Sequence, residues 1–295
     1  MRSLLFIPGD DERKLGKGMA VGADALIVDL EDAVSAGRKA AAREIAASYI
    51  KATKPLAARP RLFVRINALE TPDWEQDLAA IVTSAPDGIL LPKAHSGEDV
   101  HKLSIALAHA EELAGIATGT LRVIAIATEL PHSLLHLDTY VGASSRLTAL
   151  TWGAEDLSAR LGARGNREDD GRTWRSPYLL ARNLCLITAA AAGVEPIDTV
   201  FVNLRDGEGL GQEAREAARD GFTGKMAIHP DQVAPINEAF TPTAEEVKSA
   251  EEIVRAFADK PDAGVVAIAG SMVDRAHVVR AERLLARARA AGRTP

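Results

Sequence analysis

The chain has 295 residues and a formal net charge of −6, with 35 basic and 41 acidic side chains. This acidic balance argues against a nucleic-acid-binding surface, which normally shows a basic excess. Hydrophobic residues make up 47% and aromatic residues only 4%, so the composition predicts the aliphatic core usual for parallel sheets. The single cysteine, Cys185, excludes an internal disulfide framework and a zinc site built from cysteines.

The first apolar run, Ser3–Pro8, is interrupted at once by Pro8-Gly9. It is too short for a signal peptide, and no apolar run in the sequence reaches the roughly 18 residues that span a bilayer. We therefore expect a soluble, cytoplasmic protein that acts on small molecules.

Short apolar runs recur along the chain, each followed by turn residues and an amphipathic segment. Eight of these runs predict β-strands, at Ser3–Pro8, Ala25–Leu30, Leu62–Ile66, Gly88–Pro92, Val123–Thr128, Leu147–Trp152, Thr199–Leu204 and Lys225–His229. The intervening segments predict helices, which include Arg38–Lys51, Asp73–Val82, Val100–Leu113 and Tyr178–Ala191. Eight strands alternating with helices are typical of a (β/α)8 TIM barrel. A doubly wound sheet is the alternative, but no Gly-x-Gly-x-x-Gly follows the first strand.

Residues 1–240 are enough for this barrel, so residues 241–295 form a C-terminal extension. A helix is predicted over Thr243–Ala258, with Thr243 as its N-cap. Gly264–Val273 is predicted to be extended, as in a hairpin, and Asp274 begins a last helix that ends near Ala290. We expect this helical extension, or lid, to pack on the barrel or on a neighbouring subunit.

Charged side chains gather where the predicted strands end, which is the active-site rim of a TIM barrel. Glu129 follows the fifth strand, and Glu155 and Asp156 follow the sixth in the segment Trp152-Gly153-Ala154-Glu155-Asp156. Mg²⁺ is typically held by one or two carboxylates, and water and substrate oxygens complete its shell. We predict that Glu129 and Asp156 hold a metal ion, with Glu155 a weaker candidate. Asp156 as a helix N-cap is the structural alternative.

Other rim residues have two interpretations each. Arg65 can hold a substrate carboxylate in a bidentate fork, or it can form an ion pair with Asp29 or Glu31. Arg13 and Lys14 follow the first strand and can either contact phosphates or form a solvated helix face. Lower-ranked ligand contacts are Asp32, Lys93 and His229.

These residues lie in segments that resemble the citrate lyase β-subunit-like family of the HpcH/HpaI aldolase superfamily, which includes malyl-CoA and citramalyl-CoA lyases. The resemblance runs in order through almost the whole chain. Its segments are Arg2–Gly9, Asp29–Val34, Lys39 with Ala42-Arg43, Val64–Asn67, Leu91–Lys93, Thr128-Glu129, Gly153–Leu157, Ala227–Pro230 and Met272–His277.

The resemblance implies a set of roles. Glu129 and Asp156 would bind Mg²⁺, with Mn²⁺ a possible substitute, and Arg65 would bind the carboxylate of a 2-oxo or hydroxy acid. Coenzyme A, as part of the substrate, would place its phosphates near Arg13 and Lys14. Asp274 would act catalytically in the site of a neighbouring subunit of a homo-oligomer, a trimer or hexamer; its structural alternative is the N-cap of the last helix.

We accordingly expect a Mg²⁺-dependent carbon–carbon lyase that cleaves or forms a 3-hydroxyacyl-CoA by a Claisen-type reaction. The sequence departs from many relatives after Glu129, where Leu130-Pro131-His132 is bulkier than the small residue and glycine found there, so the substrate stays open. Alternatives are a metal-dependent 2-oxo-acid aldolase without CoA, a malyl-CoA-type thioesterase, and a citrate lyase-like subunit that works only in a complex.

Overall fold

The computed structural model describes residues 1–268 and 270–292. The chain divides into two compact units, Met1–Asn237 and Glu238–Pro295. Among the described residues, none of the helices is both long enough and apolar enough to cross a membrane.

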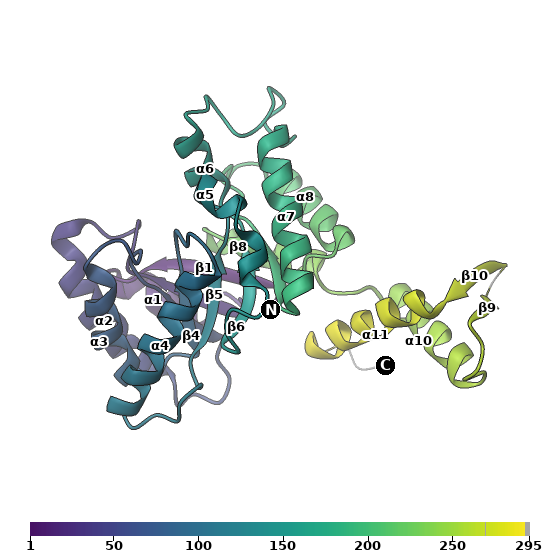
Figure 1. Ribbon diagram of the computed structural model, residues 1–295, viewed down its shortest axis with the longest axis horizontal. Coiled ribbons are helices and arrows are strands. Elements are labelled where there is room, and N and C mark those ends of the chain that lie inside the picture. Colours follow the sequence, from purple (N-terminus) through teal and green to yellow (C-terminus); the bar gives the residue numbers. More distant parts are fainter. Residues whose placement is uncertain (269, 293–295) are drawn as a thin grey trace. The chain divides into compact units, whose positions relative to one another are not determined.

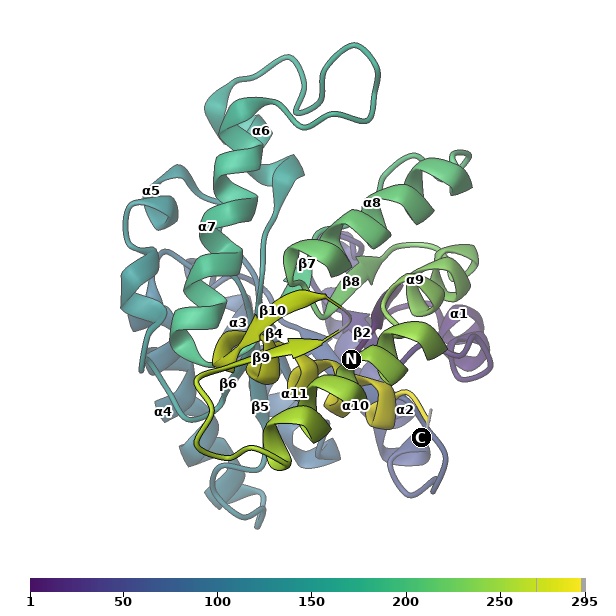
Figure 2. The same ribbon diagram turned by 90° about the vertical axis from the view of Figure 1, so that its right-hand side faces the viewer.

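The first unit is a closed barrel of parallel strands surrounded by helices (Figures 1 and 2). The strands follow one another around the barrel in chain order, and β1 closes it by pairing with β8. This arrangement confirms the predicted (β/α)8 fold. The strands are β1 (Ser3–Pro8), β2 (Ala25–Asp29), β3 (Arg61–Arg65), β4 (Gly88–Leu91), β5 (Arg122–Ile126), β6 (Leu147–Thr151), β7 (Glu195–Asp198) and β8 (Gly224–Ala227).

The position predicted for the seventh strand, Thr199–Leu204, is wrong. β7 is Glu195–Asp198, and the predicted segment lies after it in the loop that leads to the next helix. The β-branched and aromatic residues at 199–202 favoured the later position, whereas Pro196 and the flanking acids made the true strand hard to recognise. Consequently Asp198, and not the segment Asn203–Asp206, ends this strand.

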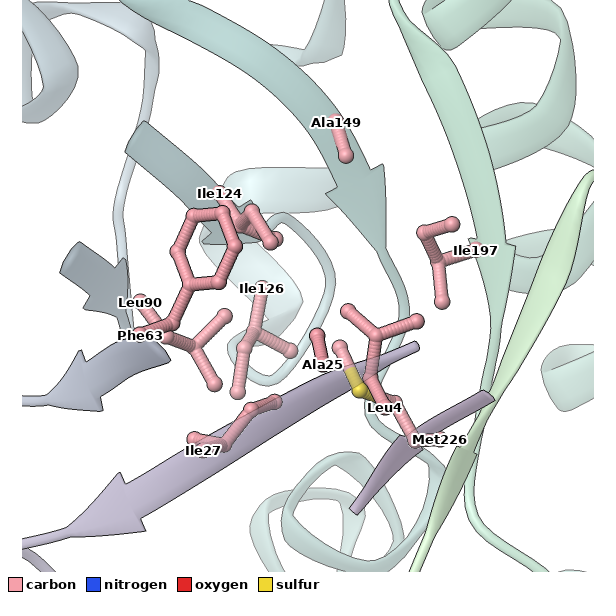
Figure 3. Close-up of a cluster of buried hydrophobic side chains, with 10 residues drawn as sticks. All are labelled: Leu4, Ala25, Ile27, Phe63, Leu90, Ile124, Ile126, Ala149, Ile197 and Met226. Carbon is pink, nitrogen blue, oxygen red and sulfur yellow. The ribbon is translucent and has the colours of Figure 1, made fainter. Parts of the chain in front are cut away.

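The inside of the barrel is filled by side chains that alternate along the strands (Figure 3). Ile124 and Ile126 both face the interior from β5, as expected for residues two apart in a strand. The buried interior cluster comprises Leu4, Ala25, Ile27, Phe63, Leu90, Ile124, Ile126, Ala149, Ile197 and Met226. Because the interior is a packed core, the functional side chains of a TIM barrel lie at its rim.

Helices follow the strands and cover the outside of the sheet (Figure 2). The four helices predicted in this unit are confirmed with ends shifted by up to three residues. The helices are α1 (Glu12–Gly18), α2 (Lys39–Thr53), α3 (Asp73–Ile81), α4 (Gly97–Leu113), α5 (Pro131–Leu134), α6 (Ala154–Leu161), α7 (Ser176–Ala192), α8 (Gly207–Asp220) and α9 (Val233–Ala239).

The second unit contains α10 (Ala244–Ala258), β9 (Val265–Ile268), β10 (Ser271–Asp274) and α11 (Arg275–Ala290). Thr243 caps α10 in a capping box with Glu246. β9 and β10 pair as the antiparallel hairpin that the sequence predicts, and residue 269 of that prediction lies outside the described residues. Phe257, Val266 and Val273 form the apolar centre of this unit.

Candidate metal centre and active site

Glu129 lies at the rim just after β5, in a pocket that its neighbours shape closely. Its side chain is only 2% exposed, and its carboxylate accepts a hydrogen bond from the backbone N–H of Lys93. Gly153, which follows β6, leaves room for it: an ideal Cβ at this glycine would lie 2.5 Å from Glu129 Cγ. The absence of a side chain at residue 153 therefore creates the space in which Glu129 lies.

Burial, together with the neighbouring charges of Glu31 and Asp156, raises the pKa of Glu129 to about 8. The hydrogen bond from Lys93 and the charge of Arg65 act in the opposite direction. A buried carboxylate close to two others is costly to ionise unless a cation is nearby. The site therefore has an excess of negative charge that a hard cation would balance.

Asp156 lies in the first turn of α6 and is 36% exposed, so it is open to a ligand from solution. Its interpretation as a helix N-cap is wrong, because Gly153 occupies that position. Glu155, the weaker metal candidate, accepts a hydrogen bond from Asn166 Nδ2 at 2.7 Å. Asp156, unlike Glu155, is among the charges that raise the pKa of Glu129.

Arg65 ends β3 and is held by acids of the β2 loop. Its Nε and Nη2 donate to the two carboxylate oxygens of Asp29 at 2.7 and 2.5 Å, and its Nη1 lies 3.1 Å from Glu31. These anions raise the pKa of Arg65 above its usual value, against the opposing effect of burial. The structure thus realises the ion-pair alternative, and a role toward substrate stays a prediction.

Lys93 follows β4 and connects several of the acids. Its ammonium lies 2.5 Å from Glu31, 3.1 Å from Asp32 and 3.8 Å from Asp156. The pKa of Lys93 is raised because its hydrogen bond and ion pairs with these acids outweigh the cost of burial. Sequence reasoning ranked this residue low, since a lysine at a strand end gives no sign that its backbone binds Glu129.

The carboxylate pair fits a Mg²⁺ site of the kind that keeps most of its shell for water and substrate. Glu129, just after β5, and Asp156, in the first turn of α6, would supply oxygen ligands, and the space at Gly153 admits the Glu129 side chain. In residues 1–268 and 270–292 no group of three or more His, Cys, Asp or Glu side chains is arranged around a metal position. Among these residues, the rim therefore has no metal site in which protein side chains supply all the ligands.

Three further candidates lie apart from the carboxylate pair. Arg13 and Lys14 are exposed on α1, where Asp11 accepts a hydrogen bond from the Lys14 backbone and lies 3.4 Å from its ammonium. His229 accepts a hydrogen bond from the Asp231 N–H and thereby caps a short turn. All three positions are compatible with a structural role.

Asp274 belongs to the second unit and caps α11. It accepts hydrogen bonds from the backbone N–H groups of Ala276 and His277, and His277 Nδ1 lies 2.6 Å from its carboxylate. These hydrogen bonds lower the pKa of Asp274, so the residue is ionised at neutral pH. The N-cap alternative is therefore confirmed, and it leaves a catalytic role open.

A buried polar network supports the segment that carries Gly153 and Asp156. Trp152 Nε1 donates to Asp198 at 2.7 Å, and Asp198 pairs with Lys225, which is fully buried, at 2.7 Å. Lys225 also lies 2.8 Å from Glu213, which in turn pairs with Arg167 at 2.7 Å. The network connects the residue after β6 with β7, β8, α8 and the segment 162–175, and it holds Trp152 in place.

The closed barrel and the carboxylates that follow β5 and β6 at its rim define the class of protein. The chain has the scaffold of a TIM-barrel enzyme. The family model for HpcH/HpaI aldolase/citrate lyase matches residues 2–230. The chain belongs to this family, which confirms the resemblance and the expectation of a lyase-type enzyme.

Individual relatives match over nearly the full length. The chain is 34% identical to citrate lyase subunit beta of Leuconostoc mesenteroides subsp. cremoris, covering 96% of this chain and 92% of that protein. It is 33% identical to human mitochondrial citramalyl-CoA lyase (92% and 81% covered) and to the (3S)-malyl-CoA thioesterase of Cereibacter sphaeroides (98% and 95%). The crystal structure of protein CitE from Mycobacterium tuberculosis, in complex with magnesium, acetoacetate and coenzyme A, is 33% identical and covers 97% of both chains with a TM-score of 0.79.

Proposed function

We propose that this protein is a Mg²⁺-dependent carbon–carbon lyase that cleaves or forms a 3-hydroxyacyl-CoA of the malyl-CoA or citramalyl-CoA type. The observation that carries the proposal is the pair Glu129 and Asp156 at one rim, with Gly153 leaving the space for Glu129. The magnesium, acetoacetate and coenzyme A bound by the mycobacterial relative support it.

Glu129 and Asp156 would hold the metal. When bound, Mg²⁺ would supply Lewis acidity toward the oxygen on which negative charge develops. Ionised Glu129 is required for this task, and the metal's charge would offset the effect of burial on its pKa. The exposed Asp156 would provide the ligand nearest to solvent.

Arg65 would orient the substrate by contacting its carboxylate through the side of the guanidinium that carries Nη1. Asp29 fixes the opposite side through two hydrogen bonds, so the guanidinium plane has little freedom to turn. Such preorganisation is the main way in which a positioned arginine assists a reaction. A substrate carboxylate would have to share Nη1 with Glu31, which now lies 3.1 Å away.

In the cleavage direction, the bond between the hydroxyl-bearing carbon and the α-carbon of the thioester breaks. Its electron pair stays on the α-carbon, the hydroxyl becomes a carbonyl with loss of its proton, and the resulting enolate takes up a proton to give the acyl-CoA. Backbone N–H groups in the first turn of α6, beside Glu155 and Asp156, would stabilise oxyanion character.

Asp274, in the site of a second copy of the chain, would take the proton from the α-carbon in the condensation direction and, once protonated, would return it to the enolate in the cleavage direction. It is ionised and half exposed, with its side chain 46% accessible. Through the hairpin register it shares a face with Val265, which is 52% exposed, and with Met272, which is 71% exposed. An aspartate beside exposed apolar side chains suits a surface that another subunit covers, in keeping with a homo-oligomer such as a trimer or hexamer.

Coenzyme A would extend from the site so that its phosphates meet Arg13 and Lys14, which are exposed at the start of α1. An arginine and a lysine are both suited to bind the oxygens of a diphosphate. This contact distinguishes the proposal from an aldolase that acts on free 2-oxo acids without CoA.

The proposal is tested by incubating the purified protein with Mg²⁺ and a panel of 3-hydroxyacyl-CoA esters and identifying the products by mass. A lyase gives an acyl-CoA and a 2-oxo acid in equal amounts. Release of free CoA together with the intact hydroxy acid would identify instead the thioesterase chemistry named for the relative from Cereibacter sphaeroides. Inactivity of the pure protein with every ester, combined with activity in the presence of partner proteins, would favour a subunit that works only in a complex.

A further inference from the structure

Lys93 has a backbone conformation that lysine rarely adopts. Its φ is +49°, and among the described residues the other non-glycine with a positive φ is Ala85. Ala85 ends a short 3₁₀ helix, where a left-handed residue is common. Lys93 instead follows a strand, at the rim of the barrel. A left-handed L-residue is strained, and such strain persists only where surrounding contacts impose it.

The consequence of this conformation is a hydrogen bond to the candidate metal ligand on the next strand. With φ positive, the N–H of Lys93 points across from β4 to the carboxylate of Glu129, which accepts it. That carboxylate is buried and has unfavourable acid neighbours. A fixed N–H donor therefore selects one position of the Glu129 side chain, the one in the space at Gly153.

The side chain of Lys93 provides the contacts that hold the strained backbone. Its ammonium lies 2.5 Å from Glu31 and 3.1 Å from Asp32, both in the loop after β2. β3 lies between β2 and β4 in the barrel, so the side chain extends past a whole strand. The residue is thus held at two ends, by its ammonium on one side and by its N–H on the other.

We propose that Lys93 is a positioning residue for the metal centre: its left-handed backbone aims an N–H at Glu129, and its ammonium, bound to Glu31 and Asp32, holds it in that conformation. This inference rests on the proposed metal site. The ammonium of Lys93 affects Glu129 through the Lys93 backbone, and it does not contact the metal or the substrate.

Four substitutions separate the two possible roles of Lys93, because all of them remove the ammonium but differ in their tolerance of a positive φ. Glycine adopts this conformation freely, and asparagine adopts it more readily than other residues. Alanine and valine disfavour it. We expect Lys93→Gly and Lys93→Asn to keep the Mg²⁺ affinity within about threefold of the unsubstituted protein, and Lys93→Ala to weaken it by about tenfold. Lys93→Val should weaken it further.

The measurement is Mg²⁺ binding by isothermal titration calorimetry, with circular dichroism and urea unfolding of each metal-free variant to verify folding. Ala85→Gly is the matched control, since it relieves the other left-handed residue and should leave the Mg²⁺ affinity unchanged. Equal losses of affinity in the glycine, asparagine and alanine variants would overturn the proposal, because they would assign the effect to the ammonium itself. Unchanged affinity in the alanine and valine variants would overturn it as well.

Failure of the metal site itself gives a different result. If Glu129 and Asp156 do not bind Mg²⁺, the unsubstituted protein shows no binding heat, or Glu129→Gln binds as tightly as it does. Either result would contradict the proposed function. If the unsubstituted protein binds Mg²⁺ and Glu129→Gln does not, the pattern among the four Lys93 variants decides the positioning role alone.

Discussion

The side chain of Glu129 occupies the space that a β-carbon would need at Gly153, since an ideal Cβ there would lie 2.5 Å from Glu129 Cγ. The φ of Gly153 is −118°, which any residue can adopt, so the glycine is required for space and not for backbone conformation. One glycine thereby connects the end of β6 with the candidate ligand after β5.

Gly153→Ala should displace Glu129 and weaken Mg²⁺ binding by about tenfold or more, because a methyl group at this position overlaps the Glu129 side chain and overpacking of a tight site costs roughly 1–3 kcal/mol. Calorimetric titration with Mg²⁺ measures the effect. Gly37→Ala serves as the control, since a Cβ at Gly37 meets nothing within 4 Å. An alanine at residue 153 that leaves the Mg²⁺ affinity intact would show that Glu129 is not a ligand in this position.

Metal binding should depend on pH through Glu129. With its pKa near 8, this carboxyl holds a proton at pH 6 to 7, and Mg²⁺ must displace it. The Mg²⁺ affinity should therefore rise by up to about tenfold per pH unit below pH 8 and level off above it. Titrations in buffers of different ionisation enthalpy should show release of close to one proton near pH 7. Proton release near zero would contradict the raised pKa of Glu129.

The raised pKa of Glu129 should also make the stability of the metal-free protein depend on pH. A carboxyl with an ordinary pKa of 4.5 and a folded-state pKa near 8 binds more protons in the folded state than in the unfolded state across that window. The contribution of Glu129 to the free energy of unfolding should therefore decrease as pH rises from about 5 to 8. Urea unfolding at several pH values should show this decrease, and Glu129→Gln should remove it.

Substitutions of Asp156 and Asp274 should have different effects on metal binding and on proton transfer. Asp156→Ala is expected to abolish Mg²⁺ binding and turnover together, because it removes one of two protein ligands. Asp274→Ala is expected to lower kcat by about 100-fold, the usual size of a general acid–base contribution, while the Mg²⁺ affinity stays within about twofold. Asp274→Asn, which can still cap α11, tests whether a loss reflects the charge or the helix end. Full turnover of the asparagine variant would refute a catalytic role.

Mixing the two alanine variants tests whether Asp274 acts in a second copy of the chain. Asp156→Ala and Asp274→Ala should gain activity above that of either variant alone when they are unfolded and refolded together, since some sites then combine intact Asp156 and Asp274. No recovery in hetero-oligomers verified by mass would place both residues in the same subunit's site.

Lys225 should matter for stability more than any exposed ion pair. It is fully buried between Asp198 and Glu213. Lys225→Met removes the cation that these two carboxylates share and leaves Asp198 with only the more distant Arg182, at 3.6 Å, as a cationic partner, so it should cost about 3–5 kcal/mol of unfolding free energy. Arg175→Gln breaks a half-exposed pair with Glu168 and should change stability by less than about 1 kcal/mol. Urea unfolding compares the two, and similar effects would mean that the network around Trp152 does not hold the site segment.

Sequence patterns sufficed for the barrel because seven of its strands are aliphatic runs that end in turn residues. The exception, Glu195–Asp198, contains a proline and two acids, and its strand character comes from pairing with β6 and β8. Patterns also placed Glu129, Asp156 and Arg65 at one rim. They left open whether Arg65 pairs with Asp29 or with a substrate, and they did not reveal that Lys93 is left-handed, because both depend on contacts between residues distant in the sequence.

Glu129 and Asp156 should share one divalent cation. Crystals of the unsubstituted protein grown or soaked with Mn²⁺, which replaces Mg²⁺ at oxygen sites and scatters anomalously, test it most directly. One strong anomalous peak is expected within about 2.0–2.3 Å of a carboxylate oxygen from each residue, and it should be lost in Asp156→Ala. A peak bound elsewhere, or one that contacts neither carboxylate, would contradict it.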